Sequence, residues 1–116
     1  MSDILLDAVR RYAEAYAGPT GVAQTPIPGL TTIRATKPSG IDYAISRPLA
    51  CLVLQGSKRV TMGTQTFDFS SGDSLLITSD VPTVSQITRA SSAEPYFSLV
   101  LDLDLTAIAE LAVEMK

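Results

Sequence analysis

The chain has 116 residues and a formal net charge of −3, so it has the length of one domain and an acidic balance. Only nine lysine and arginine residues are present and they are scattered, which excludes strong binding to nucleic acid by this piece alone. Histidine is absent and cysteine occurs once, which excludes histidine-based catalytic relays, ordinary transition-metal sites and intrachain disulfides, so we expect no metal and no cofactor.

The first predicted element is an amphipathic helix within residues 1–18. Its apolar side chains recur at the spacing of one helical face, at Leu5, Val9, Tyr12 and Tyr16. The dipeptide Gly18-Pro19 ends the pattern. We expect this helix to pack on the domain that follows; the alternative is an arm that docks on a partner.

The middle of the chain has the composition of a β protein. Residues 20–29 contain several breakers and are predicted to be a loop. Strands are predicted over residues 30–36, 41–46, 49–55, 58–62, 65–69, 74–78, 84–90 and 96–103. Turn residues separate these runs, including a turn at 79–82, at the spacing typical of a sandwich or barrel.

One hairpin gives a prediction about the core. Gly63-Thr64 lies between two short runs with alternating polarity. In the second run Phe67 and Phe69 share a face, which we expect to be the interior, where both rings would be core anchors.

Several segments, in order, resemble one family. The run CLVLQGSKRV at residues 51–60 resembles the signature of the N-terminal domain of AraC-type (AraC/XylS family) transcriptional regulators. The flanking pieces TPIPGL at 25–30, DVP at 80–82 and EPY at 94–96 fit the same family. The resemblance implies a mainly β fold: a cupin-like antiparallel β-barrel of jelly-roll type, with an N-terminal helix and a C-terminal helical segment.

The resemblance also implies a division of the chain and a role. We expect an N-terminal helix at 1–18, the cupin-like barrel at 19–103 and the start of a helical segment at 104–116, with a helix-turn-helix DNA-binding domain beyond residue 116. The domain would sense a small-molecule effector or mediate dimerisation, and DNA would be bound only through the later domain. Neither the effector nor the direction of regulation follows from the sequence.

Ligand-binding candidates lie on two strands, and each has an ordinary structural alternative. The candidates are Cys51, Val53, Gln55, Arg59 and Tyr96. Alternation places the first three on one face of their strand, but the pattern does not decide which face points inward. The alternatives are a buried structural thiol or a redox sensor at residue 51, a satisfied strand-end amide at 55, a solvated hairpin charge at 59 and a core phenol at 96.

The last segment predicts a helix with an apolar stripe. Its members are Leu105, Ile108, Leu111 and Met115. One interpretation is a self-association interface, in line with the resemblance, and the other is a helix that closes the open end of the barrel.

Two other functions stay open at this point. One is a metal-free enzyme on the same scaffold, with acid–base candidates Asp42, Asp68, Tyr43 and Tyr96, although we expect no enzyme. The other is a stand-alone small-molecule-binding module. No apolar run approaches the length of a membrane span and no secretory signal is apparent, so we expect a cytoplasmic protein without a membrane partner.

Overall fold

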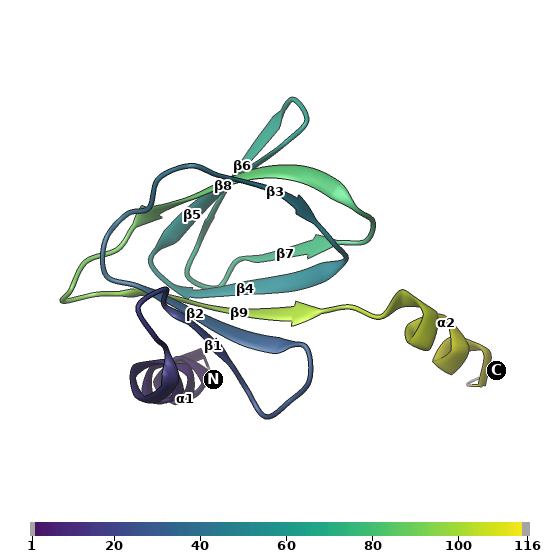
Figure 1. Cartoon of the computed structure of the whole chain (residues 1–116), viewed down its shortest axis with the longest axis horizontal. Helices are drawn as coiled ribbons and strands as arrows, with labels where there is room; N and C mark the ends of the chain where they lie inside the picture. Colours follow the sequence, from purple (N-terminus) through teal and green to yellow (C-terminus); the bar gives the residue numbers. More distant parts are fainter. Residues whose placement is uncertain (1, 115–116) are drawn as a thin grey trace.

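Two antiparallel sheets face each other in the computed structural model, which describes residues 2–114 (Figure 1). The helices are α1 (Ser2–Tyr16) and α2 (Leu105–Glu114). The strands are β1 (Val22–Gln24), β2 (Leu30–Ala35), β3 (Asp42–Ser46), β4 (Leu49–Gln55), β5 (Ser57–Met62), β6 (Gln65–Ser70), β7 (Ser74–Ile77), β8 (Val81–Arg89) and β9 (Tyr96–Asp102). One sheet has the order β1-β2-β9-β4-β7 and the other the order β3-β8-β5-β6, so the fold is mainly β and cupin-like, as predicted.

The chain passes from the first sheet to the second between β4 and β5. Gly56 alone separates the two strands, and its φ of 81° lies in the left-handed region that glycine adopts without strain. The turn leaves the strands in different layers, so the side chains on their inner faces look toward each other across the interior.

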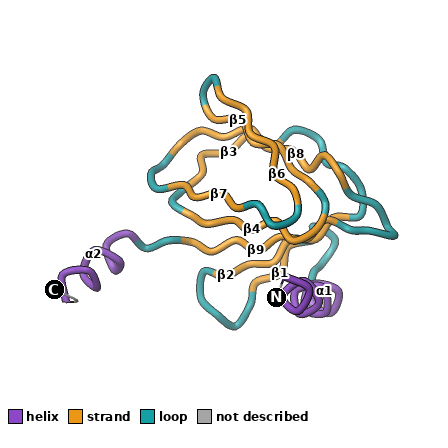
Figure 2. Tube along the Cα trace, turned by 180° about the vertical axis from the view of Figure 1, so that it is seen from behind, coloured by secondary structure: helices purple, strands orange, loops and turns teal. Residues whose placement is uncertain are grey.

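The two faces of the first sheet have different coverings. On the inner face Cys51 is paired with Val100. On the outer face, Leu54 and Phe97 form a cluster with Val9 and Ala13 of α1, which lies along this sheet (Figure 2). The helix therefore packs on the β domain and does not extend as a free arm. This also resolves the direction of β4, because Leu52 and Leu54 point out toward α1 whereas Cys51 and Val53 point in.

Most predicted strands are confirmed, with differences at two places. The predicted loop contains a short strand, β1, in which Val22 pairs with Ile33 of β2. β8 begins at Val81, where the sequence favoured a turn because of Pro82. Proline is tolerated there because this part of β8 pairs with β3 only, while β5 pairs with β8 from Val84 onward.

The prediction that Phe67 and Phe69 anchor the core is wrong. The two rings do share a face, with centroids 6.3 Å apart. However, Phe67 is 38% exposed and Phe69 is only half-buried. β6 is the edge strand of its sheet, so it has no neighbouring strand on one side. The β5–β6 hairpin also projects from the body of the fold (Figure 1).

The C-terminal helix stands apart from the sheets. α2 follows β9 and points away from the layers in both views (Figures 1 and 2). It does not cover the open end of the sheets, so the closing-helix interpretation is not supported. Neither of the described helices is long and apolar enough to cross a membrane.

Candidate functional site

The space between the two sheets contains a cavity of about 210 Å³. Strands of both sheets contribute to it, because alternate residues of each strand point inward. Its lining is mostly aliphatic, with a few polar groups: Ile33, Ser46, Leu49, Cys51, Lys58, Val60, Leu75, Ile77, Thr83, Ser85 and Val100. An apolar pocket with a few convergent polar groups is the usual form of a small-molecule site.

A second cavity of about 250 Å³ adjoins the first. Ile33, Lys58 and Ser85 line both cavities, so Lys58 stands where they meet. Asp42 and Tyr96 are among the other residues that line the second cavity. The candidate site therefore consists of an aliphatic chamber and a more polar one with a lysine between them; we call the two together the interior site.

Lys58 is the charged side chain at the centre of the interior site. It is half-buried, and its Nζ donates a long hydrogen bond to Cys51 Sγ at 4.0 Å. The ion pairs formed among residues 2–114 do not include Lys58. The interior site thus holds a cation without an anionic partner in the described chain, beside a buried thiol.

Arg59, one of the predicted ligand contacts, does not lie in the interior site. Arg59 points to the outer face of its sheet, where its Nε donates a hydrogen bond to Asp68 Oδ1 at 2.8 Å. The neighbouring Lys58 faces the interior instead. The alternation of β5 could have predicted this orientation. The apolar Val60 is expected to face inward, and Lys58, two positions earlier, shares its face.

Tyr96 is buried on the inner face of β9, at 1% exposure. Burial raises the pKa of its phenol well above the ordinary value of 10.0, and the nearby Ser98 hydroxyl offsets part of this rise. Ser98 Oγ is itself buried and, within residues 2–114, has no hydrogen-bond partner in bonding geometry. The phenol therefore remains a protonated hydrogen-bond donor at neutral pH.

The remaining ligand candidates have different surroundings. Cys51 is buried and lines the first cavity. Val53 shares its face but does not line either chamber of the interior site. Gln55 Nε2 donates a hydrogen bond to the Pro95 carbonyl oxygen at 2.8 Å, so this amide has a structural partner within the domain.

The acid–base candidates are not assembled into a catalytic group. Asp68 is paired with Arg59 on the outer face, and Tyr43 is 76% exposed. Asp42 and Tyr96 line the same cavity, but no hydrogen bond found within residues 2–114 joins them. Over the same residues, no cluster of three or more histidine, cysteine, aspartate or glutamate side chains is placed to hold a metal ion.

The predicted interface residues are only partly described. Leu111 is 56% exposed on α2, and the side chains of Leu105 and Ile108 lie outside the described part of the chain, as does all of Met115. The stripe therefore stays a prediction.

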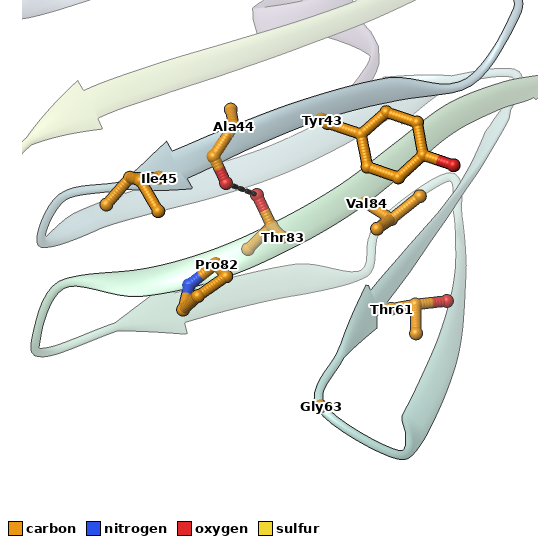
Figure 3. A pocket seen from close by; sticks show the side chains of 8 residues that line it. All are labelled: Tyr43, Ala44, Ile45, Thr61, Gly63, Pro82, Thr83 and Val84. Atoms are coloured by element: carbon orange, nitrogen blue, oxygen red, sulfur yellow. Dashed lines mark hydrogen bonds between the residues drawn. The ribbon is translucent and has the colours of Figure 1, made fainter.

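A separate groove of about 560 Å³ lies on the outer face of the second sheet. Tyr43, Ile45, Pro82 and Val84 line it, and they come from β3 and β8 (Figure 3). The Thr83 hydroxyl turns from it toward the Ala44 carbonyl oxygen, to which it donates at 3.4 Å. The groove has the larger volume, but none of the charged side chains of residues 2–114 lines it, whereas Lys58 and Asp42 line the interior site, so the interior site is the better candidate for a specific small molecule.

Comparison with models of known protein families shows which family the chain belongs to. The family model described as "AraC-type transcriptional regulator N-terminus" matches residues 26–116, which is most of the chain. The chain belongs to this family. The match confirms the family assignment that the segments at 25–30, 51–60, 80–82 and 94–96 indicated, and the interior site is the interior of an AraC-type N-terminal domain. Among curated proteins, no match to the chain was found.

Solved structures agree on the fold. The AraC-type domain is similar to a protein of Neisseria meningitidis, with a TM-score of 0.58 at 9% identity over 83% of this chain and 96% of the other. The cupin domain of Drosophila melanogaster CENP-C gives 0.51 at 14% identity over 74% and 72% of the two chains. The cupin domain of Schizosaccharomyces pombe Cnp3 gives 0.50 at 11% identity over 77% and 63%. At these identities the likeness shows the cupin-like fold alone.

Proposed function

We propose that this domain is the effector-sensing and dimerisation domain of an AraC-type DNA-binding regulator, and that its effector binds in the interior site. The observation that carries this proposal is the pair of cavities between the sheets, aliphatic on one side and bordered by a few polar groups on the other. Family membership supports the regulatory role. The volumes of about 210 and 250 Å³ favour a small effector, since drug-sized ligands occupy about 300–1,000 Å³.

DNA binding, in this proposal, belongs to a helix-turn-helix domain that follows residue 116. The net charge of −3 disfavours phosphate contacts by this domain. A regulator of this kind acts on DNA in the cytoplasm and catalyses no reaction. The scattered positions of the acid–base candidates support the non-enzymatic role.

A ligand screen with a blocked variant tests effector binding. The whole chain is melted in the presence of a library of small charged and neutral organic molecules, because a ligand at about 100 times its Kd stabilises a protein by about 2.7 kcal/mol. The variant Ser85→Met fills the interior site at a residue that lines both cavities, and should abolish any shift. Thr88→Met introduces the same side chain at an exposed residue of β8 that lines neither cavity, and should keep the shift. Molecules that still raise the melting temperature of the Ser85→Met variant would contradict the proposed site.

Self-association is proposed through the apolar stripe on α2. The helix stands away from the sheets, and Leu111 and Val113 are both exposed on it. Only Leu111 belongs to the predicted stripe, so the two residues provide a matched pair. In sedimentation, Leu111→Glu should dissociate the dimer whereas Val113→Glu should not. A monomeric wild-type chain, or a dimer that both variants leave intact, would contradict this interface.

A further inference from the structure

Hydrogen-bond donors outnumber acceptors where the two cavities meet. Lys58 supplies an ammonium group, and Ser85 supplies a hydroxyl that no hydrogen bond within residues 2–114 uses. Tyr96 adds a phenol to the same chamber. The neighbouring hydroxyls of Ser46 and Thr83 bond each other at 2.7 Å and are already occupied. The unused polar groups at this point therefore form a cluster of donors around one cation.

The charge of Lys58 is not balanced by the protein. A cation removed from water without a partner costs free energy, which is why charges in protein interiors are normally paired. Asp42 is the carboxylate in the second cavity, but it is exposed and forms no ion pair with Lys58. The other charged side chain of β5, Arg59, is paired on the outer face. The ammonium group of Lys58 is therefore available to an anion that enters the interior site.

Building on the proposed function, we infer that the effector is a small monocarboxylate whose anionic head pairs with Lys58 and whose apolar body fills the aliphatic chamber. Within residues 2–114, Lys58 is the only cationic side chain that lines the interior site, and its one charge matches a single negative charge. Beyond Lys58 the first cavity is lined by Ile77, Leu75 and Val100, which suit an alkyl or aryl group. Asp42 is the register partner of Ser85 across β3 and β8, but it is exposed, so solvent screens its repulsion of an anion bound at Lys58.

The inference predicts a difference between acids and their amides. Hexanoate and benzoate are titrated by calorimetry into the whole chain beside hexanamide and benzamide, which match them in shape but carry no charge. A hydrogen bond to a charged group contributes about 1.5–3 kcal/mol, so the acids should bind at least about tenfold more tightly than the amides.

Two substitutions test whether the tighter binding of the acids depends on Lys58. Lys58→Met should weaken binding of the acids about 10- to 100-fold, to the level of the amides, and should leave the amides unchanged. Lys37→Met makes the same change at an exposed lysine of the β2–β3 turn and should leave all affinities unchanged. Lys58→Met should melt no lower than the wild type because it removes an unpaired interior charge; if it does not fold, Lys58→Gln replaces it.

The outcomes separate this inference from the proposed function. Amides that bind as tightly as acids overturn the monocarboxylate assignment but leave an effector site in the interior. Acid binding that Lys58→Met does not weaken overturns it as well, because the anion then binds elsewhere. If neither acids nor amides bind, the inference fails, and the blocked-variant screen alone decides the proposed function.

Discussion

Gly56 lies against Tyr96 so closely that a Cβ at residue 56 would come within 3.1 Å of Tyr96 Cα and 2.5 Å of the Arg89 carbonyl oxygen. The same glycine has a φ of 81°. Gly56→Ala should therefore lower the free energy of unfolding by about 2–4 kcal/mol, since it combines left-handed strain with a backbone clash. Urea unfolding followed by circular dichroism measures this loss.

Gly63 is the matched control, at the tip of the β5–β6 hairpin. It has a φ of 62°, but nothing lies within 4 Å of the position of its Cβ. Gly63→Ala should cost only the strain, about 1–2 kcal/mol. Equal losses in the two variants would show that the close approach of the sheets at Gly56 is absent in solution.

Much of this fold was predictable from the sequence because local signals agreed. The continuous apolar run of β4, the Gly63-Thr64 turn and the alternation of β6 placed these strands within a residue or two. Burial was harder to predict. Alternation shows that Phe67 and Phe69 share a face, but only the tertiary structure reveals that their strand lies at a sheet edge.

Phe97 is buried in the way that we expected from the sequence for Phe67 and Phe69. It is fully buried under α1 at 0% exposure, whereas Phe67 is 38% exposed. Phe97→Ala should cost about 3–5 kcal/mol. Phe67→Ala should cost about half as much or less, because much of its ring already contacts water. Thermal melts of the two variants check the order, and a larger loss in Phe67→Ala would mean that the hairpin folds back over the interior.

The contact between α1 and the first sheet has its own test. Ala13 is 1% exposed at this contact, while Ala15 on the same helix is exposed. Ala13→Leu should destabilise the domain by about 1–3 kcal/mol by overpacking. Ala15→Leu introduces the same side chain in solvent and should change stability by less than about 0.5 kcal/mol. If neither substitution changes the stability of the domain, α1 does not pack on the sheet and is instead a free arm.

Tyr96 makes stability depend on pH at the alkaline end. The unfolded chain ionises this tyrosine near its ordinary pKa of 10.0, whereas burial raises the pKa in the folded chain. The corresponding stability is complete below pH 10.0 and is lost as the pH rises from there toward the folded-state pKa. Urea unfolding between about pH 9 and pH 11 should show a steeper loss for the wild type than for Tyr96→Phe.

The exposed Tyr43 supplies the control for this pH dependence. Tyr43→Phe should keep the wild-type slope of stability against pH. If the slope is instead lost in Tyr43→Phe and retained in Tyr96→Phe, the alkaline loss does not come from the buried phenol.

The interior site was less predictable than the fold. The sequence named Cys51 and Tyr96, which the structure places on inner faces, but it also named Arg59 and passed over Lys58. The choice between two adjacent basic residues depends on which face of β5 looks inward. That direction follows from how the sheets stack, and Val60 was the only local indication of it.

The most direct test of the account is a map of where small molecules bind. Methyl resonances of the whole chain are followed by nuclear magnetic resonance while the hits of the ligand screen are added. If the domain senses its effector between the sheets, the shifts should gather at Ile33, Ile77 and Val100, which line the first cavity. Shifts that gather at Ile45 and Val84 of the outer groove, with the interior methyls unchanged, would contradict an interior effector site.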